Sequence, residues 1–283
     1  MEIFELFEYA FFRNAMGAAF LMSVSCGLVG TYIVSRRMVF ISGGITHASF
    51  GGVGISYFFG WPPMAGAAVF ALIAAMATEN LTRKKKIRND SLIAVMWSLG
   101  MAIGIIFIYL TPGYSPNLMS FLFGSIITVT LTDLLFMLML TITVLLVFIF
   151  MYRLILFVSF DEQFARTRGI PVMLVNYVLI ILVALTIVLS IRVAGIILVL
   201  SLLTIPQNTA NLFTHNFAKI LTWSVIIGFL GAMIGLYTSY YLNIPSGATI
   251  IFSLVALYLL GRVIRAISQK NYRNPEWVSR KSE

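Results

Sequence analysis

The chain has 283 residues, of which 60% are apolar and only 10% are charged. This composition excludes an ordinary soluble domain, because such domains contain about 25% charged residues. The net charge of +9 is compatible with nucleic-acid binding, but the cations cluster between long apolar runs. That placement favours a membrane topology signal and speaks against an RNA- or DNA-binding patch.

Apolar runs of about 20 residues are long enough to cross the roughly 30 Å hydrocarbon core of a bilayer as helices. We therefore predict an all-α, polytopic integral membrane protein with eight or nine crossings. One transmembrane domain covers residues 1–264, and a C-terminal tail covers residues 265–283. The nine candidate spans are Ala15–Val34, Met38–Gly60, Met64–Leu81, Ser91–Leu110, Leu134–Tyr152, Val172–Ser190, Val193–Phe213, Ile220–Tyr241 and Ala248–Ile264.

The distribution of cations predicts the orientation in the membrane. If the nine spans alternate in direction, nearly all cations fall on one side, and only Arg13 and Arg192 fall on the other. The positive-inside rule then places the N-terminus outside and the C-terminal tail in the cytoplasm. The cytoplasmic cations would be those of the tail together with Arg36, Arg37, Arg83, Lys84, Lys85, Lys86, Arg88, Arg153, Arg166, Arg168, Lys219 and Arg262.

A histidine lies near the middle of the second span. His47 is nine residues into Met38–Gly60, roughly 13 Å along a helix. An ionisable group at that depth is costly and usually marks a path or a site, although a histidine bonded to a neighbouring serine or carbonyl would serve structure alone. We give the two interpretations equal weight, and the functional one makes His47 a candidate ligand for a cation.

Small residues surround this histidine. Gly44, Ala48 and Gly52 follow a small-xxx-small pattern, which predicts a stripe that packs directly against another helix. Gly43 and Gly51 lie one turn before and after His47, and we expect them to leave open space around the imidazole.

The loop Ser159–Pro171 has the features of a short helix. Ser159 and Glu162 have capping-box spacing, and Gly169 is a favourable residue after a helix end. Phe160 and Phe164, four residues apart, should then share one exposed face. They either rest on the bilayer and neighbouring helices or dock into a partner protein.

Two other polar features are interpreted more simply. The run Pro206–Asn211 interrupts the seventh span, and we expect that helix to end there with the polar side chains at the cytoplasmic interface. We expect Asp133, near another interface, to be solvated.

The sequence indicates no enzyme. It contains no phosphate-binding G-x-x-x-x-G-K-[ST] loop, and no catalytic set of residues lies within a span. We expect a transport pathway whose energy comes from a partner chain. The alternative is a secondary transporter or channel that acts without an ATPase.

From about residue 9 to residue 262 the sequence resembles the membrane-spanning permeases of bacterial zinc, manganese or iron ABC importers, which have a type II ABC importer fold. No single segment is decisive, but together, in this order and spacing, they are quite specific. The segments that carry the resemblance are Arg13-Asn14-Ala15 with Cys26–Gly30 and Arg36–Met38, then Thr46–Val53, Phe121–Ile126 and Phe160–Pro171, and finally Pro206 with Thr209 and Ala210.

The resemblance implies a homodimeric permease in the inner membrane, with cytoplasmic ABC ATPase subunits and an external metal-binding protein as partners. It implies a transported divalent metal ion and no permanently bound cofactor. The loop Ser159–Pro171 would be the cytoplasmic coupling helix that fits a groove of the ATPase. Its coupling residues would be Phe160, Asp161, Phe164, Ala165, Arg166 and Gly169.

The resemblance also makes His47 a gating or metal-binding residue, with one departure. Family members usually carry an aspartate four residues before this histidine, and here that position is Gly43. Imidazole and carboxylate together suit Zn²⁺ or Mn²⁺. Three possibilities remain: another helix supplies the second ligand, two copies of His47 cooperate across the dimer, or the chain moves a different substrate.

Overall fold

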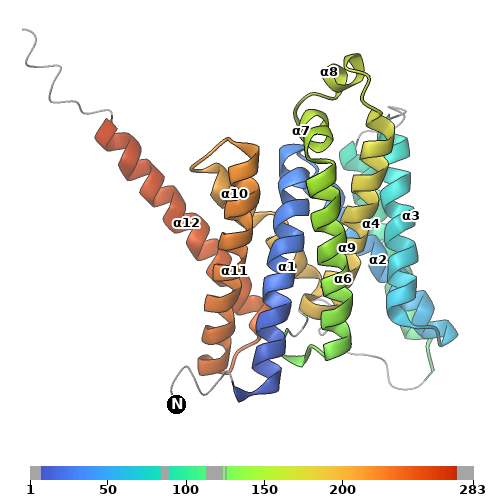
Figure 1. Ribbon diagram of the computed structural model, residues 1–283. Helices are drawn as coiled ribbons and strands as arrows, with labels where there is room; N and C mark the ends of the chain where they lie inside the picture. The colour runs from blue at the N-terminus through green and yellow to red at the C-terminus, as the bar shows by residue number, and fades with distance from the viewer. Residues whose placement is uncertain (1–7, 84–88, 113–123, 125, 273–283) are drawn as a thin grey trace, which may run out of the picture.

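The computed structural model describes residues 8–83, 89–112, 124 and 126–272, and all regular elements in this part are helices (Figure 1). The basic segment 84–88 and most of the predicted segment Phe121–Ile126 therefore lie outside the described residues. The elements are α1 (Ala10–Ser35), α2 (Val39–Phe59), α3 (Pro63–Arg83), α4 (Asn89–Leu110), η2 (Ile126–Thr128), α6 (Leu131–Phe150), α7 (Tyr152–Phe160), α8 (Glu162–Thr167), α9 (Val172–Leu202), α10 (Ile205–Asn211), α11 (Phe217–Leu242) and α12 (Ser246–Tyr272).

The long helices run between two ends of the molecule (Figure 1). At one end, here called the α8 end, Arg36 follows α1 and donates a hydrogen bond to the Val158 carbonyl of α7 at 3.0 Å. At the opposite end, Asn14 in the first turns of α1 donates to the Val129 carbonyl, just before α6, at 3.3 Å. The helices α1 and α6 thus rise side by side towards α7 and α8.

Charge is unevenly divided between these two ends. Lys219 lies at the α8 end with Arg36, because the neighbouring Phe217 ring contacts Phe160, the last residue of α7. Arg192 lies at the opposite end, where it pairs with Asp133 in the first turn of α6. The structure therefore gathers the cations as the sequence predicts, with most of the described ones at the α8 end.

Seven helices in the described part are long and apolar enough to cross a membrane. The predicted span Met38–Gly60 corresponds to α2, which is not one of the seven because its glycines, serines and histidine lower its mean hydropathy. On the outer helices, large apolar side chains such as Phe150 and Phe252 remain exposed. A surface of this kind is stable against lipid tails and unstable against water.

The predicted sixth and seventh spans meet at a sharp break in the helix α9. Val172–Ser190 and Val193–Phe213 are predicted as separate helices, and α9 indeed consists of two helices that meet at Gly195, whose φ is 78° and whose backbone is not helical, a few residues beyond the predicted boundary. This left-handed conformation suits glycine. A Cβ on Gly124 would lie 2.2 Å from the Ala194 carbonyl carbon, so Gly124 itself packs directly on the kink. After this kink the chain runs back to the α8 end through the rest of α9 and the shorter α10 (Figure 1).

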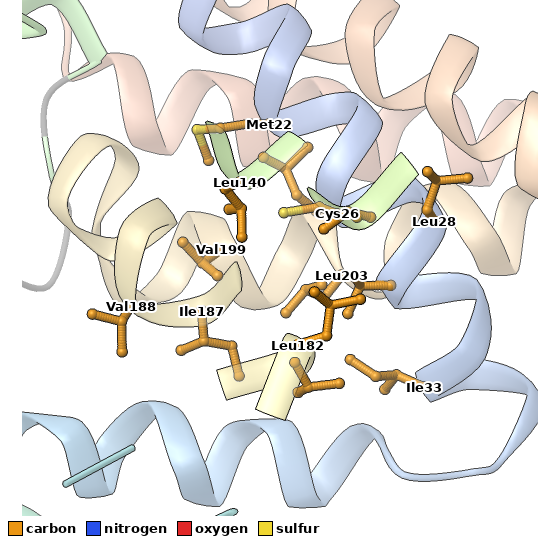
Figure 2. Close-up of a cluster of buried hydrophobic side chains, with 14 of the residues drawn as sticks. Met22, Cys26, Leu28, Ile33, Leu140, Leu182, Ile187, Val188, Val199 and Leu203 are labelled. Atoms are coloured by element: carbon orange, nitrogen blue, oxygen red, sulfur yellow. The ribbon is translucent and has the colours of Figure 1, made fainter. Parts of the chain in front are cut away.

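The core forms where α1, α6 and α9 meet. Of the seven spans, α1 is the most completely buried. Figure 2 shows Met22 and Cys26 of α1 beside Leu140 of α6 and Ile187 of α9. These side chains interlock away from lipid, so α1 forms the centre around which the other spans pack.

Candidate functional site

His47 lies on α2 and is held by an aromatic contact. Its ring stacks on the Trp97 indole of α4, with ring centroids 3.8 Å apart and an interplanar angle of 14°. The Nδ1 atom is buried and has no hydrogen-bond partner among the described residues. Stacking therefore fixes the plane of the imidazole while this ring nitrogen remains uncommitted, and imidazole nitrogen is a good ligand for Zn²⁺ and other transition metals.

The space expected around His47 is filled. A Cβ on Gly43 would lie 3.4 Å from Cζ3 of Trp97, and a Cβ on Gly51 would lie 3.0 Å from the Gly100 carbonyl oxygen. The absence of a side chain at Gly43 lets the indole approach α2 and stack on the imidazole. The prediction of an open space was wrong because α4, which the sequence pattern could not place, occupies it.

Within the described ranges, no three His, Cys, Asp or Glu side chains come together as a possible metal-binding group. Where the resembling permeases usually carry an aspartate, this chain has Gly43, which lies beside the Trp97 indole. Trp97 itself had no signal in the sequence, because one aromatic residue in an apolar span is unremarkable until its neighbours are known.

The small residues of α2 divide between two neighbouring helices. A Cβ on Gly44 would lie 3.1 Å from Cγ2 of Ile93, and Ala48 lies against Gly100, both on α4. Gly52 faces α3, where a Cβ would lie only 2.0 Å from the Gly66 carbonyl oxygen. The α2 backbone therefore approaches α3 and α4 more closely than any larger side chain would allow.

The predicted coupling segment 159–171 contains the end of α7, the helix α8 and the turn that follows. Asp161 is the N-cap of α8, and its Oδ1 accepts a hydrogen bond from the Phe164 N–H at 2.9 Å. The predicted capping box from Ser159 was wrong, because Ser159 is buried and α7 continues past it.

The end of α8 follows the sequence pattern. Gly169 has φ of 73°. Its N–H bonds to the Arg166 carbonyl, and the Ile170 N–H bonds to the Ala165 carbonyl, at 3.0 and 3.1 Å. These two bonds form a Schellman motif, which ends the helix sharply.

Two phenylalanines are exposed in this segment. Phe160 is 65% exposed and Phe164 is 46% exposed, whereas Ala165, which follows Phe164, is buried. They belong to different helices, so the expectation that they share one helix face was wrong. Each ring touches one further ring, Phe217 for Phe160 and Phe157 for Phe164. Both rings nevertheless leave much apolar surface uncovered at the α8 end.

Glu162 fixes α8 to the bundle. Its carboxylate pairs with Arg36, which follows α1, and with Arg166, both at 3.1 Å, and accepts a hydrogen bond from Asn176 of α9 at 3.4 Å. Burial favours the protonated carboxyl, but the hydrogen bonds and charges of Arg166 and Arg36 outweigh it and lower the pKa of Glu162. Glu162 therefore links α8 to the end of α1 and to α9.

Asp133 is not solvated as expected. It is 8% exposed, forms a capping box with Thr130 and pairs with Arg192 of α9. A buried carboxylate requires a compensating cation. Arg192 supplies it, and the pair links the start of α6 to the part of α9 just before Gly195.

The polar run Pro206–Asn211 also lies deeper than expected. Gln207 is fully buried, and its Nε2 donates to the carbonyls of Cys26 and Leu202 at 2.9 and 3.0 Å. The amide thus satisfies backbone carbonyls at the break between α9 and α10, and the prediction that the run lies at the membrane interface was wrong for this residue.

Known proteins share the sequence pattern and the fold of this chain. Residues 8–265 match the model of the family described as "ABC 3 transport family". An uncharacterized membrane protein of Synechocystis sp. is 41% identical over 258 residues, covering 91% of this chain and 92% of the relative. The manganese transport system membrane protein MntC of Halalkalibacterium halodurans is 32% identical, covering 90% and 88% of the two chains.

A solved structure has the same fold. PsaBC from Streptococcus pneumoniae in complex with Fab contains a chain that superposes with a TM-score of 0.82 at 29% sequence identity. The superposition covers 92% of this chain and 95% of that one. The shared architecture therefore includes nearly all of the elements described above.

Proposed function

We infer the function from the family: this chain belongs to the ABC 3 transport family and is the membrane-spanning permease of a metal importer of the ATP-binding cassette class. The observation that carries this conclusion is the family match over residues 8–265, which includes both α2 with His47 and α8. The chain is thus a transport subunit of the inner membrane.

We propose that the transported substrate is a divalent metal ion: zinc, manganese or iron. A relative is named as a manganese transport protein, and the uncommitted nitrogen of His47 suits such ions. With glycine at position 43, the remaining ligands would come from a second copy of His47, from another helix or from water. The ion is cargo, and no permanent cofactor is needed for this role.

We propose three protein partners. Two cytoplasmic ABC ATPase subunits would dock on the α8 end, an external metal-binding protein would deliver the ion to the opposite end, and a second copy of this chain would complete a homodimer. The gathering of cations at the α8 end supports a cytoplasmic position for it, with the N-terminus outside. The permease domain would cover residues 1–264 and the cytoplasmic tail residues 265–283.

The contacts of α8 suggest how ATP drives transport. Closure of the ATPases would move α8, and the Glu162 pairs would carry this motion to α1 and α9. The close packing of α2 on α3 and α4 makes these three helices move as one body. The permease would thereby alternate between outward and inward openings around His47.

Reconstitution in liposomes tests this function. We expect the purified chain alone neither to hydrolyse ATP nor to take up metal. The complex with its ATPase and binding protein should take up Mn²⁺ or Zn²⁺ only when ATP is present on the side of the membrane that carries the ATPase. Uptake by the chain alone under an ion gradient would instead indicate a secondary carrier.

Replacing Phe164 with glutamate tests the docking role of α8. A charge on this exposed ring position should weaken association with the ATPase by about 10-fold or more, because apolar anchors dominate docking energies. Co-purification with tagged ATPase measures this effect. The conservative Phe164→Leu variant should remain associated and both variants should insert normally, whereas unchanged co-purification of Phe164→Glu would contradict the docking role.

A further inference from the structure

A groove of about 710 Å³ lies between α11 and α12, beside the end of α10. The two helices touch closely where Gly235 meets Ile250, and from there α12 leans away from α11 towards the α8 end (Figure 1). Apolar side chains such as Leu230 and Leu257 form most of its walls, and Lys219 lines its mouth. The groove is therefore apolar along its length and cationic at one end.

The dimensions of the groove match one leaflet of a bilayer. Lys219 and Leu230, both lining residues, are separated by roughly 16 Å along α11 at 1.5 Å per residue. Half of a typical hydrocarbon core is about 15 Å. Trp223, another lining residue, is 51% exposed one turn below Lys219, where aromatic side chains mark the membrane interface.

The helices that form the groove supply no acidic partner for its cationic mouth. The sequence contains no Asp or Glu between Glu162 and Glu276, so α10, α11 and α12 carry positive charge alone. Arg265 lies one helical turn beyond the lining residue Gly261 and adds to this charge. Lys219 also lies in the first turn of α11, where the helix dipole favours an anion. An anion from outside the chain would supply the counter-charge that these helices lack.

We propose that this groove binds one anionic phospholipid, with an acyl chain between α11 and α12 and its phosphate at Lys219. A second copy of the chain that presents the same face is the less suitable occupant, because its α10–α12 region carries only cations and would bring like charges together at the mouth. An acyl chain fills an irregular apolar groove, and the phosphate supplies the counter-charge.

Lipid retention tests the proposal with phosphatidylglycerol and phosphatidylcholine as probes. The full chain is purified from nanodiscs that contain equal amounts of both lipids, and the retained lipid is identified by native mass spectrometry. We expect the wild type to retain phosphatidylglycerol preferentially. Lys219→Gln should reduce this preference about fivefold, the effect of one interfacial charge, whereas Lys219→Arg should keep it.

Arg262→Gln is the matched control. Arg262 is exposed at the same end of α12 but does not line the groove, so its loss removes one positive charge without touching the site. Equal loss of phosphatidylglycerol in Lys219→Gln and Arg262→Gln, or equal retention of both lipids by the wild type, would overturn the proposal.

The groove itself is tested by Leu260→Trp and Leu260→Cys. Tryptophan at this lining position should fill the groove and displace the bound lipid while membrane insertion remains normal. The native thiol, Cys26, is buried, so a disulfide formed between two Leu260→Cys chains would report a second copy in the groove and would refute lipid occupancy.

Discussion

Replacing Gly52 with alanine is expected to destabilise the protein by about 3 kcal/mol or more, the upper range for overpacking a well-packed core. The added Cβ would lie 2.0 Å from the Gly66 carbonyl oxygen and 2.9 Å from Cβ of Phe70 on α3. Because the nearest atom belongs to the backbone, no rotation of a side chain can relieve the clash. The two helices would have to separate, which would also shift His47.

Thermal unfolding of the purified chain in detergent measures this effect, with Gly17→Ala as the control. Gly17 also lies within a spanning helix, but a Cβ there would lie 3.5 Å from Cδ2 of Leu134, an ordinary contact. Alanine should be neutral or slightly stabilising at this position, because it favours helix over glycine. A similar loss of stability in both variants would show that close α2–α3 packing is not the cause.

The helical architecture could be predicted from sequence because it depends on local properties. A run of about 20 apolar residues must become a helix in lipid, whatever surrounds it. The end of α8 could also be predicted from sequence, since Gly169 and Pro171 end a helix through backbone geometry alone. The break between Val172–Ser190 and Val193–Phe213 was predicted, but its position at Gly195 was not. One glycine among many in membrane helices does not show which of them takes a non-helical conformation.

The start of α8 shows how tertiary packing chooses between local patterns. Ser159 with Glu162 and Asp161 with Phe164 have the same three-residue spacing, and both are compatible with an N-cap. The burial of Ile155 and Val158 extends α7 to Phe160. Ser159 then lies inside a helix, and Asp161 becomes the cap. Neither side chain indicates this outcome without the bundle against which α7 packs.

Contacts between distant residues could not be predicted at all. Glu162 meets Arg36 across 126 positions, and Gln207 meets Cys26 across 181. A single sequence marks such residues as polar groups in unusual places but does not show their partners. The same holds for Trp97, which occupies the space that Gly43 leaves beside His47. The position of the candidate ligand was therefore predictable, and its surroundings were not.

Replacing His47 with alanine is expected to reduce metal uptake by the assembled complex by about 10- to 100-fold or more, the range that follows the loss of groups supporting a metal. The reason is chemical: Nδ1 of His47 is buried and uncommitted, and no group of three metal-ligating side chains replaces it in the described part of the chain. Initial uptake rates at several metal concentrations measure the change. A lost ligand should raise the concentration needed for half-maximal uptake.

The control is His215→Ala, which removes the other histidine of the chain from an exposed position between α10 and α11. It should transport normally. The His47→Ala complex should still assemble and hydrolyse ATP, because His47 lies on α2 and α8 carries the proposed docking surface. Loss of assembly together with uptake would indicate that the stack on Trp97 holds α2 and α4 together. An unchanged uptake rate in His47→Ala would remove this histidine from the transport path.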